Sequence, residues 1–127
     1  MAPIKLYTAQ TPNGYKVSIF LEELKAAYGL EYEFQSLSFS KNEQKEPWFL
    51  EINPNGRLPA LTDTFTDGTT IRLFESGSIM QYLVDRYDKD HKVSYPRDAK
   101  EHWEVNNWVS TRHFTAFATA KVLIDIA

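Results

Sequence analysis

The first 36 residues of the chain place one amphipathic segment between two short alternating segments. Residues 3–7, PIKLY, alternate apolar and polar side chains as a half-buried strand does. Residues 17–28 carry apolar side chains at helical spacing, and Gly29 follows them, where a helix commonly ends. Residues 31–39, EYEFQSLSF, alternate again. A strand, a helix and a strand in this order predict two parallel strands joined by a right-handed crossover.

A hairpin and a second helix are predicted further along the chain. The segments LPALTD (58–63) and TTIRLF (69–74) are typical of strands, and the Asp67-Gly68 pair between them is a strong signal for a tight turn. Residues 75–88 return to helical spacing. Added to the first unit, these elements predict an α/β fold, in which a mixed four-stranded sheet is flanked by helices.

The remaining segments suggest a second, helical part of the chain. A short helix is predicted around residues 47–52, within a polar stretch. Residues 88–98 are charged and are typical of a linker, and residues 105–127 follow helical spacing with one interruption, which predicts one long helix or two short ones. We therefore expect a first domain over residues 1–88. Residues 89–127 are expected to form a linker and the start of an all-helical domain.

Composition excludes several classes of function. The chain has 127 residues and a formal net charge of −3, without a basic patch, so nucleic acid is not an expected partner. It has no cysteine, which excludes disulfides, a catalytic thiolate of its own and cysteine-ligated zinc. The three histidines are spaced at eleven residues, which does not suit a metal site: His91, His102 and His113. Neither a secretory signal nor an apolar run of membrane-spanning length is present, so we expect a cytoplasmic protein without a membrane partner.

The first candidate site cluster lies between the first strand and the first helix. Thr11 and Asn13 flank Pro12 there, and Gly14 follows. Ligands of α/β sheets bind beyond the carboxyl ends of strands, and a helix N-terminus offers free N–H groups and partial positive charge to an anion such as a thiolate. The alternative is that Asn13 only caps the helix, and on this cluster alone the cap is favoured.

The second cluster is the segment Arg57-Leu58-Pro59, at the start of a predicted strand. Proline removes a donor from a strand, so it is usually found at an edge or a bulge. With a cis bond before Pro59, the backbone of Leu58 would face outward and could pair with a peptide-like ligand as an added strand. The alternative is an ordinary trans proline at a strand entry.

The third cluster, Glu75-Ser76, lies between the last predicted strand and the helix that follows. The Ser76 hydroxyl and the free N–H groups of the helix could hold a carboxylate, and Glu75 could hold an ammonium group. Together they would recognise the head group of an α-amino acid. The alternative is that Ser76 is the N-cap and that Glu75 only complements the helix dipole.

Three segments in this order resemble the glutathione transferase superfamily: TPNGYKV, NPNGRLPAL and FESGSIMQYL. Within the superfamily, they are similar to the Ure2-like or nu-class branch. The similarity covers the chain to about Tyr87 and extends more weakly through WEVNNWVS. It implies a thioredoxin-like first domain.

The resemblance also implies a role for each cluster. Leu58–Pro59 is expected to be cis, with the Leu58 backbone paired to the cysteinyl unit of glutathione. Glu75 and Ser76 are expected to hold the γ-glutamyl end, and Arg57 and Gln44 to lie near the glycyl carboxylate. Some relatives have a histidine where this chain has Gln44. Thr11 and Asn13 are the expected catalytic residues, near the thiol. Glutathione is thus the expected co-substrate, and no metal is implied.

Members of the superfamily continue with a further helical domain, which builds the electrophile pocket and much of the dimer interface. This chain is therefore expected to be a truncated, alternatively spliced or degraded version. Its last helical segment would expose apolar side chains to water and favour a homodimer: Trp108, Phe114, Phe117 and Leu123.

Two functions are open on the sequence alone. The chain is either a glutathione transferase, which activates the glutathione thiol for transfer to electrophiles in detoxification or for reduction of a peroxide or disulfide, or a non-catalytic module. Such a module would bind glutathione or a protein partner, as a Ure2-like regulator does. Truncation would reduce turnover more than binding, because the missing domain builds the second-substrate pocket.

Overall fold

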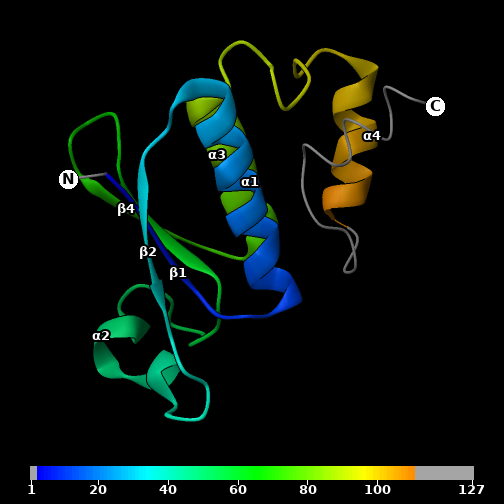
Figure 1. Cartoon of the computed structure of the whole chain (residues 1–127). Coiled ribbons are helices and arrows are strands. Elements are labelled where there is room, and N and C mark those ends of the chain that lie inside the picture. Colours follow the sequence, from blue (N-terminus) through cyan, green and yellow to red (C-terminus); the bar gives the residue numbers. More distant parts are fainter. Residues whose placement is uncertain (1–2, 111–127) are drawn as a thin grey trace.

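The computed structural model describes residues 3–110 of the chain, which form nine elements (Figure 1). The first part contains β1 (Ile4–Thr8), α1 (Pro12–Tyr28) and β2 (Tyr32–Ser36), followed by a 3-10 turn, η1 (Glu43–Lys45), and the short α2 (Pro47–Leu50). The second part contains β3 (Ala60–Thr64), β4 (Thr70–Phe74), α3 (Ser76–Tyr87) and α4 (Lys100–Val109).

The four strands form one mixed sheet in the order β2-β1-β3-β4. β1 and β2 are parallel, with Ile4 opposite Tyr32, whereas β3 is antiparallel to both β1 and β4. The predicted parallel unit and the predicted hairpin are both confirmed. In the hairpin, Gly68 has a φ of 83°, and Asp67 Oδ1 accepts from the Thr69 N–H at 2.9 Å.

Two helices cover one face of the sheet, and the short α2 packs on part of the other. α1 and α3 lie side by side on one face, as Figure 1 shows, and the main core is buried beneath them. Successive side chains of a strand point to opposite faces, so Leu6 joins this core while Tyr7 joins a smaller cluster with Phe49 of α2. The main core contains these buried side chains: Ile4, Leu6, Val17, Phe20, Leu21, Leu24, Leu61, Ile79, Met80, Leu83, Val84, Val93, Val105 and Val109.

The N-cap of α1 is Thr11 and not Asn13. The Thr11 hydroxyl accepts from the Gly14 N–H at 3.1 Å, while Asn13 is an exposed residue of the first turn. The alternative that Asn13 caps the helix was therefore wrong: Thr11 comes before Pro12, the first helical residue, and has the extended backbone of an N-cap. At Gly14, an added Cβ would lie 2.3 Å from the Ala9 carbonyl oxygen, so only glycine lets α1 start this close to the end of β1.

The start of α3 also differs from the cap alternative. Ser76 is the first helical residue, and the N-cap position is occupied by Glu75, whose side chain makes no capping hydrogen bond. The Glu75 backbone has a φ of 69° and a ψ of 121°, a conformation that non-glycine residues rarely adopt. Conformations of this kind cost on the order of 1–3 kcal/mol and are concentrated at functional sites.

The charged segment after α3 is packed against the first part of the chain. Buried Asp88 accepts from the Ser94 hydroxyl at 2.6 Å and from the Lys92 N–H at 2.8 Å, and the Tyr28 hydroxyl at the end of α1 also donates to it. Val93 is part of the main core. The linker predicted from its charge is therefore an ordered connection that leads into α4.

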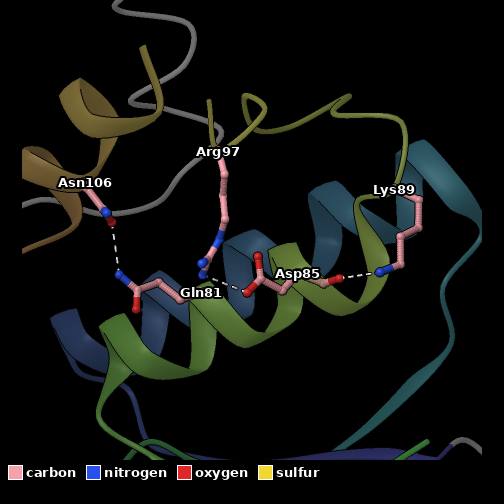
Figure 2. Close-up of polar contacts among 5 residues, drawn as sticks. All are labelled: Gln81, Asp85, Lys89, Arg97 and Asn106. Carbon is pink, nitrogen blue, oxygen red and sulfur yellow. Dashed lines mark hydrogen bonds and ion pairs between the residues drawn. The ribbon is translucent and has the colours of Figure 1, made fainter. Parts of the chain in front are cut away.

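α4 and the connection that precedes it each make a polar contact with α3 (Figure 2). Gln81 Nε2 donates to Asn106 Oδ1 at 3.0 Å, and Arg97 forms an ion pair with Asp85 at 3.1 Å. The predicted helix is confirmed from Val105 to Val109, and its continuation falls outside the described residues. No helix within residues 3–110 has both the length and the apolar character needed to cross a membrane.

Candidate functional site

A small cleft opens where the N-termini of α1 and α3 meet the turn that leads into β3. Its volume is about 80 Å³. Seven residues line it: Asn13, Asn53, Arg57, Leu58, Pro59, Glu75 and Ser76. Six of the eight predicted site residues thus come together, from three separate parts of the chain. Thr11 and Gln44 are not among the lining residues.

The Leu58–Pro59 peptide bond is cis, as predicted from the resemblance. Within residues 3–110, no hydrogen bond joins the Leu58 backbone N–H or C=O to another residue. Leu58 is half-buried and lines the cleft directly before β3. Its backbone can therefore pair with an extended peptide-like ligand as an added strand.

Asn53 is a site residue that the sequence analysis missed. Its side chain is buried, donates to the Arg57 carbonyl at 2.9 Å and accepts from the Asn55 N–H at 3.0 Å. Both bonds hold the turn that carries Leu58. The segment NPNG indicated only a turn, although Asn at its first position often bonds the backbone two residues on.

The N-terminus of α3 forms the opposite wall of the cleft. The free N–H groups of its first turn and the Ser76 hydroxyl are hydrogen-bond donors, and the helix dipole adds partial positive charge. The Glu75 carboxylate lies beside them and is exposed. A group with both a carboxylate and an ammonium would find a partner for each charge here.

The N-terminus of α1 contributes the remaining donors. Since the Thr11 hydroxyl accepts from Gly14, its own hydrogen can be donated to a ligand. Asn13 lines the cleft, and its Oδ1 accepts from Lys16 Nζ at 3.1 Å. Lys16 belongs to the segment TPNGYKV, but its place in the sequence did not indicate a role.

Gln44 lies behind the turn and not in the cleft. It belongs to η1, where its Nε2 donates to Asn42 Oδ1 at 3.2 Å. A Cβ at Gly56 would lie 2.8 Å from the Gln44 carbonyl oxygen, so η1 packs directly on the turn before Arg57. Gln44 supports that turn through its backbone, and its predicted contact with a ligand carboxylate stays a prediction.

A separate apolar groove is lined by residues that come before and after Thr11 in the chain. It has a volume of about 330 Å³ and lies between β1, β2 and the first turns of α1. Its lining residues are Leu6, Thr8, Ala9, Gln10, Tyr15, Ser18, Tyr32, Phe34 and Ser36. The groove falls within the range of roughly 300–1,000 Å³ that is typical of small-molecule pockets, whereas the cleft is smaller.

Asp63 joins β3 to α3. This buried carboxylate accepts from the Tyr82 hydroxyl at 2.7 Å and from the Tyr87 hydroxyl at 2.6 Å. Burial, followed by the hydrogen bonds to Asp63, raises the pKa of both tyrosines above the ordinary value of 10.0. Within residues 3–110, no group of three or more acidic or histidine side chains could hold a metal ion.

A mixed sheet of this strand order, with a cis-proline turn before β3 and a cleft at two helix N-termini, defines a thioredoxin-like domain. The family model of the glutathione S-transferase N-terminal domain matches residues 2–85. The chain therefore belongs to the glutathione S-transferase family.

Known members of the family are similar in both sequence and structure. The glutathione S-transferase-like protein gedE of Aspergillus terreus is 47% identical over 86% of this chain and 44% of its own length. A glutathione transferase homolog from Lodderomyces elongisporus, solved with two glutathione molecules per subunit, is 50% identical, with a TM-score of 0.73 over 86% of this chain and 49% of its own.

The transferase URE2P6 from Phanerochaete chrysosporium was solved with oxidized glutathione. It is 47% identical, with a TM-score of 0.73 over 85% of this chain and 47% of its own length. These similarities confirm the predicted resemblance to Ure2-like transferases. The chain spans about half the length of the relatives it matches.

Proposed function

We propose that this chain binds glutathione in the cleft and stabilises its thiolate for reaction with a second substrate. One observation carries the proposal. The cleft brings together the Leu58 backbone, which has no hydrogen-bond partner within residues 3–110, the N-termini of two helices, and side chains of both charges. Glutathione has a peptide centre, two carboxylates, one ammonium and a thiol. Each of these groups has a complementary partner at the site.

The assignment of groups follows from charge and hydrogen-bonding capacity. Glu75 pairs with the ammonium of the γ-glutamyl unit, while Ser76 and the α3 N–H groups hold its carboxylate. Arg57 pairs with the glycyl carboxylate, and Leu58 pairs with the cysteinyl backbone. The thiol then faces the N-terminus of α1, where Thr11 and Asn13 stabilise the thiolate.

The chemistry uses the sulfur of glutathione, because the chain has no cysteine. In transfer, the thiolate attacks an electrophilic carbon, a C–S bond forms, and the leaving group departs with its electron pair. In disulfide reduction, the thiolate attacks one sulfur and forms a mixed disulfide, a second glutathione thiolate releases glutathione disulfide, and the substrate leaves as two thiols. The apolar groove beside Thr11 supplies a wall for the second substrate.

Finer assignments belong to the same proposal. We place the chain in the nu-class branch, as a cytoplasmic homodimer with a role in detoxification. The segment TPNGYKV supports the branch, since it offers a threonine and an asparagine where other transferases use a tyrosine, serine or cysteine.

A non-catalytic module is the second candidate. The observation that favours it is size: the cleft measures about 80 Å³, and the apolar groove is open to solvent. Turnover of an electrophile needs a pocket that excludes water, whereas binding of glutathione does not. A domain of this kind would bind glutathione and contact a protein partner, as a Ure2-like regulator does.

Calorimetry with glutathione, paired with turnover assays, tests both candidates. We expect binding by the parent chain and a loss of about 1.5–3 kcal/mol in Glu75→Gln, the value of a hydrogen bond to a charged group. Glu51→Gln, at an exposed acidic residue outside the cleft, is the matched control. Turnover of a chlorodinitrobenzene-type electrophile, a peroxide or a disulfide would favour the transferase. Binding without turnover would favour the module, and absence of binding would refute both.

A further inference from the structure

Lys16 is a lysine that the fold buries. Its side chain is 4% exposed, whereas Lys25 on the same helix is exposed. An ammonium group loses its hydration on burial, and that loss is tolerated only where the charge is hydrogen-bonded inside the protein. The contacts of Lys16 therefore show what its charge is used for.

The side chain of Lys16 reaches back one turn of α1 to the site. Nζ donates to Asn13 Oδ1 at 3.1 Å. A lysine ammonium can only donate hydrogen bonds, so the atom of the carboxamide that faces it must be the oxygen. The amide nitrogen of Asn13 is consequently turned away from Lys16. Asn13 lines the cleft and is exposed, so its N–H donors are accessible to a ligand there.

We propose that Lys16 is a positioning residue, which holds the Asn13 carboxamide with its N–H donors toward the sulfur of the bound thiolate. The identity of that ligand rests on the proposed function. The orientation matters because the two ends of a carboxamide act oppositely on an anion. The amide nitrogen donates a hydrogen bond to a thiolate, whereas the amide oxygen repels it.

The positive charge of Lys16 strengthens the same contact. A cation bound to the amide oxygen polarises the carboxamide and makes its N–H groups better donors, an effect that a low-dielectric environment increases. Lys16 thus acts on the thiol through Asn13. Removal of its charge is expected to raise the pKa of the bound thiol even though Asn13 itself is unchanged.

The first test uses the free protein and does not depend on glutathione. The side-chain amide of Asn13 is followed by ¹⁵N NMR and identified by its loss in Asn13→Ala. We expect Lys16→Met, which keeps the length of the side chain, to shift this resonance, while Lys16→Arg restores it and Lys25→Met leaves it unchanged. An Asn13 amide that is the same in Lys16→Met and in the parent would overturn the proposal.

The second test measures the thiol. The ultraviolet absorbance of the bound thiolate is titrated in the same variants, and the affinity for S-methylglutathione, which has no ionisable thiol, is measured beside it. We expect the thiol pKa to rise by about one unit in Lys16→Met, with the S-methylglutathione affinity unchanged within about twofold. An unchanged thiol pKa would also overturn the proposal. An equal loss of affinity for glutathione and for S-methylglutathione would overturn it too, because Lys16 would then only support the fold.

The two tests separate this inference from the proposed function. If the parent chain does not bind glutathione, the proposed function fails, and the NMR measurement still decides whether Lys16 orients Asn13. If the parent binds glutathione and Lys16→Met has no effect on either readout, the inference fails while the function stands.

Discussion

Asp63 and Tyr87 lie 24 residues apart in the chain, and the Tyr87 hydroxyl donates to Asp63 Oδ2 at 2.6 Å. Tyr82 donates to the same oxygen. A buried carboxylate on β3 thus accepts from two hydroxyls of α3, so the strand that follows the Leu58–Pro59 turn and the helix that follows Glu75 are held in one arrangement. The contact joins elements whose order was evident from the sequence but whose exact docking was not.

This network is expected to make the free energy of unfolding fall as the pH rises into the alkaline range. The folded-state pKa values of Tyr82 and Tyr87 are raised above 10.0, first by burial and then by Asp63. The stabilisation is therefore present in full below pH 10 and is lost as the pH rises through the folded-state values. We expect the free energy of unfolding to fall above about pH 10 less steeply in Tyr82→Phe than in the parent.

At neutral pH, Tyr82→Phe should also lower the free energy of unfolding, by about 1.5–3 kcal/mol, because a hydrogen bond to a charged group is lost. Urea unfolding at pH 7 and at alkaline pH measures both effects. Tyr15→Phe, at an exposed tyrosine, serves as the control. Parallel pH profiles for the parent and Tyr82→Phe would contradict the prediction.

Asn53 is expected to support both the turn and the site. Asn53→Ala leaves the Arg57 carbonyl and the Asn55 N–H without their side-chain partner, at a residue that is 1% exposed. The loss should lower the free energy of unfolding by about 1–3 kcal/mol. It should also weaken glutathione binding, because the turn carries Leu58.

Denaturant unfolding and calorimetry measure the two effects of Asn53→Ala. Asn55→Ala is a matched control, because Asn55 takes part in the turn through its backbone N–H and is exposed. A variant that is less stable but binds glutathione as tightly as the parent would show that the turn does not need Asn53 to hold the ligand.

Thr11 is expected to act both as the N-cap and as a donor to the thiol. Thr11→Val removes the hydroxyl and keeps the shape, whereas Thr11→Ser keeps the hydroxyl. Loss of an N-cap costs about 1 kcal/mol of stability. If the hydroxyl also donates to the thiolate, the thiol pKa should rise by about one unit or more. That estimate follows because such a bond contributes about 1.5–3 kcal/mol and one pKa unit corresponds to about 1.4 kcal/mol.

Thermal unfolding and ultraviolet titration of bound glutathione separate the two roles of Thr11. Thr11→Ser should match the parent in both measurements. A drop in stability with an unchanged thiol pKa in Thr11→Val would reduce Thr11 to a helix cap.

Local patterns in the sequence predicted most of the fold for a physical reason. Side chains at a spacing of two or of three to four residues must bury one face, so the strands, the hairpin and the helices follow from Ile4 onward without reference to distant parts of the chain. The site clusters were predictable for a related reason. Two lie between the end of a strand and the start of a helix, and the third lies directly before a strand, where backbone groups are free.

The errors lie where geometry overrides local preference. Ser76 is a good N-cap residue, yet the positive φ of Glu75 starts the helix one residue earlier than the cap alternative requires. The bond from the Asn53 side chain to the Arg57 carbonyl depends on the shape of the turn and not on a spacing rule. Lys16 and Asn13 lie three residues apart on one helix, so their contact was predictable, but the burial of Lys16 was not. Asp88 illustrates the same limit, because its partner Tyr28 lies 60 residues away in the chain.

Self-association through α4 is the last prediction. Trp103 is 63% exposed and Trp108 is 44% exposed on this helix, while Phe114, Phe117 and Leu123 fall outside the described residues. Large exposed aromatic side chains that gather on one helix mark interaction surfaces, and their burial stabilises association. We expect the chain to form a dimer whose dissociation constant rises about tenfold or more in Trp103→Gln, since about 1.4 kcal/mol corresponds to a factor of ten.

Size-exclusion chromatography with light scattering over a concentration series measures the dissociation constant of the dimer. Phe34→Gln, at an exposed side chain of the edge strand β2, is the control and should associate as the parent does. A parent chain that stays monomeric at every concentration would refute the prediction.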